Sequence, residues 1–528
     1  MAEIYPILPG AAPSRGGPEE VGNKAWNLMR MAQIGLPVPP AFVLPTAWCR
    51  RSLTAHDPVM RDVLAKGIAN LETATGLGFG ATRRPLLVSV RSGAAVSMPG
   101  MMETVLDIGL NDETVEGLIR LTGNPRLAWD SYRRLVQSYA EVVANLPTAP
   151  FDMLVEAALG RAQAESEQEL DHRELRSLTE AMLDCYRTLT GRDFPANPKQ
   201  QLAEAAVAVF RSWSAPKAAS YRRLNGISDE GGTAVTVQTM VYGNAGSASG
   251  AGVAFTRNPA TGARELYYDF QFNAQGADVV AGRQKMLASE RLPVVLPAAW
   301  ARLNRICREL EVLFGDAQDF EFTIQSGALF LLQTRRAKRT DWAALEIAVD
   351  MVAEGLLTPS KALARLAAID LNSVVRTSFA GPVPETLAVA QAASMGVVSG
   401  AVALDSDAVK RLTAAGTPAI LVRLETVTTD IEGMALAAGI LTGSGGRTSH
   451  AAVVARQLGK VCLVACAGLE IDPVRRHCRI GGTVVNEGDL LSLNGNTGAV
   501  HLGRLAQVTE RPERALAAIA VWRKAAAA

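Results

Sequence analysis

A long block of the chain, from Asp112 to about Leu224, is patterned for helices, and strand patterns lie on both sides of it. Inside the block, Asn124 and Pro125 are typical of a helix start, and apolar residues then recur at the helical period: Trp129, Tyr132, Leu135, Val136, Tyr139, Val143 and Leu146. Leu86 to Val90 precedes the block as a strand, and strand character returns at 234–241, 252–256, 265–272 and 319–333. These patterns predict an α+β unit with a helical insertion.

The rest of the chain divides further. Residues 341–385 are patterned as helices followed by a loop with Pro382 and Pro384, which is typical of a connector. Short strand patterns and one helical pattern then predict a compact α/β domain. We therefore expect a multidomain α+β protein, and 528 residues at about 150 per domain agree with this. The predicted segments are 1–340 with an insertion at about 112–224, a linker at 341–385, a domain at 386–505 and a tail at 506–528.

Composition excludes several classes of protein. With 53 basic and 52 acidic residues the net charge is +1, which argues against a nucleic-acid partner. There is no run of 18 apolar residues and no signal-peptide pattern at the start, so we expect a cytoplasmic protein without a membrane partner. The six cysteines form no CxxC pair, and Cys462 and Cys466 are expected in the core. Four histidines lack metal-ligand spacing, so no zinc site is predicted: His56, His172, His477 and His501.

The segment GGRTSHAAVVARQLGK places His450 just before a helical apolar pattern. A helix N-terminus offers unpaired N–H groups and a positive dipole end, which stabilise a phosphoryl group. A neutral imidazole is a suitable nucleophile for receiving one. The alternative for an isolated Thr-Ser-His tripeptide is a histidine that only helps to cap the helix.

The longer context resembles the phosphohistidine domain of the pyruvate phosphate dikinase and phosphoenolpyruvate synthase family. That motif is Gly-Gly-x-Thr-Ser-His-Ala-Ala-x-x-Ala-Arg, and every fixed position is present from Gly445 to Arg456. The flanking segments LVRLETVTTDIEGMALAAGILT and EGDLLSLNGNTG resemble the same family. The resemblance implies that His450 carries the phosphoryl group in a swivelling domain. A regulatory role of Thr448 stays open.

The beginning of the chain resembles the family's ATP-binding domain, which is ATP-grasp-like. In VGNKAWNLMRMAQIGLPVPPAFVLPT the resemblance makes Lys24 a phosphate-binding lysine, although an isolated lysine is usually a solvated surface group. In VSVRSGAAVSMPGMMETVLDIGLND it makes Arg91 a catalytic and phosphate-binding arginine, with a structural salt bridge as the alternative. Ala95 stands where the family usually has a second arginine, a departure that bears on phosphate affinity or on the acceptor.

A third block, VQTMVYGNAGSASGAGVAFTRNPATG, is predicted to be a strand followed by a loop with Gly243, Gly246, Gly250 and Gly252. Glycines let a backbone approach a phosphate closely, although a surface turn is the alternative. The resemblance implies that residues 238–241 line the adenine slot through backbone groups: Gln238, Met240 and Val241 are the cofactor-binding candidates.

In DFEFTIQSGALFLLQTR, Asp319 and Glu321 are two apart, so a strand directs both carboxylates to one face, as Mg²⁺ requires. A three-residue hairpin loop would place Gln333 and Arg335 opposite these two carboxylates, and a two-residue loop would shift the register. As a bare pattern this set also fits an exposed sheet face. The resemblance implies that all four positions belong to the metal and phosphate site.

The resemblance spans residues from about 20 to 505. Segments such as NAQGADVVAG and FTRNPATG are closer to the dikinase than to the synthase. This implies inorganic phosphate, rather than water, as co-substrate. Members of the family continue into a (β/α)₈ barrel of about 250 residues that binds pyruvate and phosphoenolpyruvate. Residues 506–528 are too few for such a barrel, so we expect the nucleotide half-reaction from this chain.

In that half-reaction, ATP and inorganic phosphate give AMP, pyrophosphate and phosphorylated His450, with Mg²⁺ as cofactor. The acceptor is then pyruvate on a separate barrel subunit, an acceptor protein or a small molecule, and a homodimer stays open. Two other hypotheses remain at this point. One is an ATP-binding regulatory or non-catalytic partner protein, and the other is a kinase for a different small molecule.

Overall fold

A computed structural model describes residues 4–527 except 11–15, 52–53, 97, 99–101, 225, 277–290, 427–429 and 447–448. Contacts between residues divide the chain into two compact units. The first consists of Met1–Gly246 and Phe330–Thr334, and the second of Ser247–Leu329 and Arg335–Ala528. Among the described helices, none has the combination of length and apolar character that a bilayer span requires.

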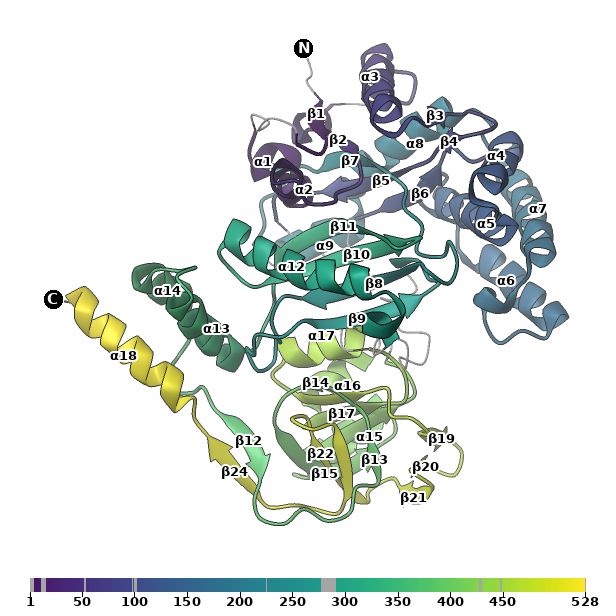
Figure 1. Cartoon of the computed structure of the whole chain (residues 1–528). Helices are drawn as coiled ribbons and strands as arrows, with labels where there is room; N and C mark the ends of the chain where they lie inside the picture. The colour runs from purple at the N-terminus through teal and green to yellow at the C-terminus, as the bar shows by residue number, and fades with distance from the viewer. Residues whose placement is uncertain are drawn as a thin grey trace. The chain divides into compact units, whose positions relative to one another are not determined.

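The first unit contains a five-stranded antiparallel sheet in the order β1-β2-β7-β5-β6 (Figure 1). Its buried Val and Leu side chains contact the helices, because β-branched and apolar residues fit a pleated buried surface. The strand bounds are Tyr5–Ile7, Ala41–Leu44, Val88–Gly93, Thr104–Ile108 and Ala234–Thr239 for β1, β2, β5, β6 and β7, and β3 (Gly78–Phe79) pairs with β4 (Pro85–Leu86). Helices α1 (Pro18–Val21), α2 (Asn23–Gln33) and α3 (Pro58–Thr75) precede β5, with a short η1 at Thr46–Trp48.

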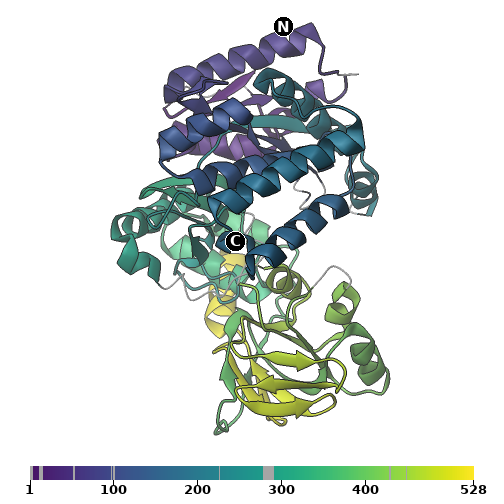
Figure 2. The same cartoon turned by 90° about the vertical axis from the view of Figure 1, so that its right-hand side faces the viewer.

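Between β6 and β7 the described residues form helices and the turns that join them, as the apolar period predicts, and the helices at 125–142 and 172–190 lie side by side (Figures 1 and 2). The expected start at Asn124 is confirmed: its side chain accepts from the Leu127 N–H, and Pro125 occupies the first turn. The bounds are Asp112–Thr122, Pro125–Val142, Ala149–Ala162, His172–Thr190, Pro198–Arg211 and Pro216–Leu224 for α4 to α9, with η2 at Glu167–Glu169 and η3 at Ser212–Ser214.

The second unit begins with a sheet in the order β11-β10-β8-β9, with bounds Ala328–Arg336, Gln318–Gln325, Gly250–Phe255 and Tyr267–Phe272. Phe270 and Phe322 stack on one face with ring centroids 5.8 Å apart. A Cβ at Gly250 would lie 2.2 Å from Phe270, and one at Gly252 would lie 2.4 Å from Phe322. The expectation that these two glycines lie in a phosphate loop is therefore wrong: they are strand residues that make room for aromatic rings. Helices α11 (Leu292–Val295) and α12 (Pro297–Phe314) precede β10.

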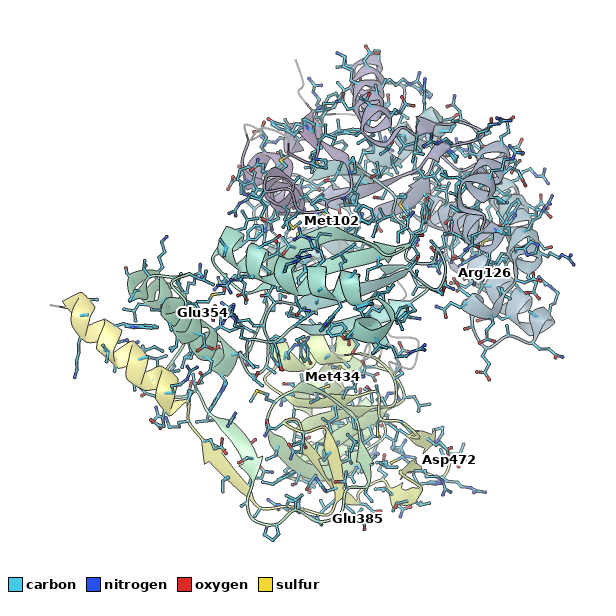
Figure 3. All side chains as sticks on the ribbon, in the orientation of Figure 1. Met102, Arg126, Glu354, Glu385, Met434 and Asp472 are labelled. Atoms are coloured by element: carbon cyan, nitrogen blue, oxygen red, sulfur yellow. The ribbon has the colours of Figure 1, made fainter. Side chains whose placement is uncertain are left out.

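The segment after this sheet and the C-terminal tail pack together. Helices α13 (Asp341–Ala353), α14 (Pro359–Leu366) and α18 (Glu513–Ala527) share one apolar core, which includes Ala515 and Ile519 of the tail. Strand β12 (Arg376–Phe379) pairs with β24 (Gln507–Glu510) antiparallel. Glu354, labelled in Figure 3, caps α13 and accepts from Arg257 at 3.0 Å. The tail is thus structurally part of the region that begins at residue 341.

Residues 388–502 form an eight-stranded mixed sheet in the order β13-β23-β22-β15-β16-β17-β18-β14. Its parallel part is β15 (Val397–Ala403), β16 (Ala419–Arg423), β17 (Gly439–Thr442) and β18 (Val461–Val464), connected by α15 (Ser406–Ala414), α16 (Ile431–Leu436) and α17 (His450–Gln457). The other strands are β13 (Ala388–Val389), β14 (Gln391–Ser394), β22 (Leu490–Asn494) and β23 (Ala499–Leu502), and β19 (Glu470–Asp472), β20 (His477–Ile480) and β21 (Thr483–Asn486) form a separate sheet. Cys462 and Cys466 are buried as expected, and burial raises their pKa to about 12 and about 11.

Candidate functional site

Lys24 lies in the first turn of α2, where the chain approaches the end of β5 closely. Gly22 caps the helix with φ of 76°, and a Cβ there would lie 2.1 Å from the carbonyl oxygen of Gly93. The N–H of Asn23 donates to the carbonyl oxygen of Ala94 at 2.9 Å. Only glycine permits this approach, which brings the Lys24 segment against the end of the strand that carries Arg91.

Arg91 is half-buried on β5, opposite Thr104 of β6 and Thr236 of β7. Its Nε donates to the Ser89 hydroxyl at 3.2 Å. In the segment that follows Arg91, the Met98 side chain is buried with Trp213, whereas Met101 lies outside the described residues.

The expected adenine segment is the end of β7 and the residues that follow it. The Gln238 side chain is 1% exposed, and its Oε1 has no hydrogen-bond partner among the described atoms. The N–H of Met240 is already used by the carbonyl oxygen of Leu87 at 2.9 Å, and Val241 is half-buried. A buried acceptor without a partner is a place where a ligand donor is expected.

Asp319 and Glu321 lie on one face of β10, while Phe320 and Phe322 are buried on the other. Asp319 is 5% exposed, and Arg335 Nε lies 2.7 Å from its Oδ2. Burial raises the pKa of Asp319 and the Glu321 charge adds to this, although Arg335 and, less strongly, Arg456 oppose the shift. Burial thus outweighs the nearby positive charges.

The loop of this hairpin is two residues rather than three. β10 ends at Gln325 and β11 begins at Ala328, with Ser326 and Gly327 at φ of 48° and 81°, as in a type I′ turn. The Ala337 N–H nevertheless donates to the carbonyl oxygen of Ala317 at 2.9 Å. Between the turn and the Ala317–Ala337 pair, β11 therefore has one residue more than β10, as in a β-bulge. This extra residue restores the contact between Asp319 and Arg335. Gln333 is buried on β11, in the part of that strand that belongs to the first unit.

The cluster contains two carboxylates, those of Asp319 and Glu321. The described residues contain no group of three acidic, His or Cys side chains that could hold a metal ion. The donor set nevertheless fits Mg²⁺, because this ion is usually bound by one or two carboxylates together with substrate phosphates and water. Asp319 and Glu321 are the residues that would hold it.

His450 is the first residue of α17, directly after a loop that follows β17. Ser449 caps the helix: its hydroxyl accepts from the Ala452 N–H at 3.5 Å. Gly445 has φ of 94°, and a Cβ there would lie 3.1 Å from the Ser449 hydroxyl. Ser449 therefore performs the capping that the alternative hypothesis gave to the histidine. Thr448 lies outside the described residues.

Asp107 is a buried acid that the sequence analysis missed. It lies where the β5–β6 register shifts, with φ of 58°, and is 2% exposed. Its Oδ1 has no hydrogen-bond partner among the described atoms, and burial raises its pKa to about 8. The nearby Tyr242 hydroxyl has its own pKa raised by burial and by Asp107. The only signal in the sequence is an acidic residue within an apolar strand.

The region that contains Arg91 and Gln238 and the region that contains His450 each match a known family model. Residues 57–287 match the AMP/ATP-binding domain of pyruvate phosphate dikinase, and residues 416–498 match the mobile domain of PEP-utilising enzymes. The chain therefore combines a region similar to the dikinase nucleotide-binding domain with a region similar to the mobile domain of PEP-utilising enzymes.

The chain is 42% identical to pyruvate, phosphate dikinase of Clostridium symbiosum over 509 residues, which are 95% of this chain and 58% of that protein. It is 43% identical to pyruvate, phosphate dikinase 2 of Zea mays, with 92% and 56% covered, and 41% identical to the Rhizobium meliloti dikinase, with 94% and 57% covered. Over nearly its whole length the chain is therefore similar to pyruvate phosphate dikinases. It spans a little more than half the length of these relatives.

Proposed function

We propose that this chain catalyses the nucleotide half-reaction of a dikinase, in which ATP phosphorylates His450. The observation that carries the proposal is His450 at the start of α17, inside a complete Gly445–Arg456 motif, in a chain that also has the dikinase nucleotide-binding domain. The α-helix N-terminus favours the negative charge that the histidine would receive. Since Ser449 already caps the helix, His450 is not needed for that purpose.

The proposed bond changes are balanced. A neutral imidazole nitrogen of His450 bonds to the β-phosphorus of ATP, the bond from that phosphorus to the bridging oxygen breaks, and AMP leaves with the electron pair. Inorganic phosphate then attacks the outer phosphorus of the pyrophosphoryl group and leaves as pyrophosphate. One phosphoryl group stays on His450.

The described residues supply electrostatic support for this transfer. Lys24 and Arg91 are proposed to neutralise phosphate oxygens, and Gln238, Met240 and Val241 to accommodate the base, with the buried Oε1 of Gln238 as an acceptor. Gln333 and Arg335 are proposed to contact phosphates beside Asp319 and Glu321. Mg²⁺ bound by these two carboxylates would reduce the charge of the triphosphate.

The proposed domain division is an ATP-grasp-like domain at 1–340, a linker at 341–385 against which the tail at 506–528 packs, and a swivelling domain at 386–505. Residues 381–386, which include Pro382 and Pro384, are exposed. We propose that the domain after residue 385 moves as a rigid body between the nucleotide and an acceptor. The names of the relatives favour pyruvate as that acceptor, bound by a separate subunit if the enzyme is split.

The test is incubation with Mg²⁺ and ATP labelled on the β-phosphate, with and without inorganic phosphate. We expect acid-labile label on the wild type and on His477→Ala, a matched histidine change on β20 of the same domain, together with AMP release. His450→Ala should carry none. Absence of label from the wild type, or equal label on His450→Ala, would reject the proposal.

A further inference from the structure

Arg456 is the last fixed residue of the Gly445–Arg456 motif, and the proposed half-reaction gives it no role. It lies near the end of α17 and is half-buried. Its Nη1 donates to the carbonyl oxygen of Ala393 on β14 at 2.8 Å. This bond fixes the guanidinium at one edge of the eight-stranded sheet.

From this position the guanidinium contacts the four-stranded sheet of the same unit. Its central carbon lies 5.8 Å from the centre of the Phe255 ring, within the range of a cation–π contact. Phe255 is the direct partner of Asp319 in the β8–β10 register, and opposite residues project to the same face. The Arg456 guanidinium therefore lies against the residue that is paired with Asp319, on the face that carries that carboxylate.

A second contact joins the same two sheets. The Tyr267 hydroxyl donates to the carbonyl oxygen of Ala392 at 3.0 Å, one residue before the carbonyl that Arg456 binds. Tyr267 is opposite Phe255 in the β8–β9 register, and the two rings meet edge to face at 6.1 Å. Tyr267 and Arg456 therefore hold consecutive β14 carbonyls beside the face that carries Asp319.

The space beside these contacts is open. A cavity of about 1510 Å³ is lined by Tyr267 and Ala392 and by residues that follow three parallel strands: Leu424, Gly443, Ser444 and Ala465. Carboxyl ends of parallel strands are the usual ligand edge of such sheets. The loop that leads to His450 begins directly after Ser444.

We propose that Arg456 is a positioning residue that brings a positive charge to the Asp319 face when the domain carrying His450 is docked there, and that the Tyr267 hydroxyl fixes this docked arrangement. This inference rests on the proposed function of the site. Docking itself then supplies a cation next to the triphosphate, so an undocked domain leaves the nucleotide site one positive charge short. The guanidinium acts through docking and charge, without bond formation.

The test compares Arg456→Gln, Arg456→Lys and Tyr267→Phe with wild type in single-turnover phosphorylation of His450 by β-labelled ATP. We expect Arg456→Gln to lower the rate constant at least about tenfold, with ATP affinity within about twofold, because misplacement costs rate rather than binding. Arg456→Lys should recover part of the rate, since it keeps the charge but not the planar fork. Arg475→Gln, which removes an arginine that is 80% exposed in the same domain, is the control and should match wild type.

Hydroxyl-radical footprinting separates this inference from the half-reaction. Phe255 and Tyr267 are 4% and 5% exposed. Loss of docking should therefore increase the oxidation of Phe255 in the double variant that combines Arg456→Gln with Tyr267→Phe. Increased oxidation with no labelling of any variant would reject the half-reaction and keep the docking contact. Unchanged oxidation in the double variant, or a wild-type rate in Arg456→Gln, would overturn the inference. If Arg456→Gln does not fold, Tyr267→Phe alone decides, and an unchanged footprint and rate would overturn it.

Discussion

Asp316 and Asp319 are three residues apart, and both side chains are 7% exposed, but their electrostatic surroundings differ. Asp316 precedes β10 and meets Arg336 and Arg339 at 2.7 Å and Arg365 at 3.5 Å. These cations hold the pKa of Asp316 below its usual value despite burial. Asp319 has an ion pair with Arg335 at 2.7 Å and Glu321 on the same face, and burial raises its pKa despite the nearby arginines.

The difference separates a carboxylate held charged by three arginines from one on which burial outweighs the nearby positive charges. A buried charge is tolerated where partners compensate it, so Asp316 is stabilised by the protein itself. At Asp319 the balance is the reverse, and we propose that a cation bound with the nucleotide adds positive charge to the face that it shares with Glu321. Asp316 and Asp319 are close in sequence, but their different charged surroundings indicate different roles.

The largest expected effect is on stability, at Asp316. Asp316→Asn leaves three guanidiniums without their common carboxylate, and removing one partner of a buried pair costs about 3–5 kcal/mol. Urea unfolding followed by tryptophan fluorescence should show this loss, with Asp319→Asn as the matched variant that loses little. Equal losses in the two variants would remove the basis of the comparison.

The next effect is on metal affinity, at Asp319. Asp319→Asn should weaken Mn²⁺ binding in the presence of ATP by at least about tenfold, because one of two carboxylate ligands is lost. Electron paramagnetic resonance of free Mn²⁺ measures this directly. Asp316→Asn, under conditions where it is folded, should bind Mn²⁺ as wild type does, and weakened binding there would contradict the assignment.

Asp107 extends the comparison to an acid buried without an adjacent ion pair. Its folded pKa is about 8, above that of the unfolded chain, so its stabilising contribution is present at low pH and is lost as pH rises toward 8. Between pH 5 and pH 8, the unfolding free energy of Asp107→Asn should fall by roughly 2 kcal/mol less than that of wild type. The effect is smaller than the full pKa difference implies, because relaxation of the protein partly offsets the cost of burying the charge. Unfolding free energies of both proteins across this range check it. Parallel pH profiles would show that Asp107 ionises freely.

The smallest effect concerns the hairpin that carries Asp319. Ser326 has φ of 48° at the first turn position, where asparagine is favoured over serine. Ser326→Asn should therefore raise the unfolding free energy by about 0.5 kcal/mol, measured by urea unfolding, with metal affinity unchanged. A loss of stability would show that the turn is of another type.

The sequence analysis predicted the helical insertion, the strand that carries both carboxylates and the helix that begins at His450, because each depends on local periodicity. It also predicted Arg335 beside Asp319, but from a three-residue loop that does not exist. The bulge that restores the pairing has no local signal, and neither has the close approach of Gly22 to Gly93. Asp316, Asp107 and the Arg456 contact with Phe255 depend on residues distant in sequence, which periodicity does not report.

The decisive measurement is the rate of His450 phosphorylation in the two aspartate variants. Single turnovers with Mg²⁺ and β-labelled ATP would be compared for wild type, Asp316→Asn and Asp319→Asn, at a temperature where all three are folded. The account predicts a near wild-type rate for Asp316→Asn and a rate at least about 100-fold lower for Asp319→Asn, the usual cost of losing one electrostatic contact to the transition state. Equal rates for the two variants would contradict it.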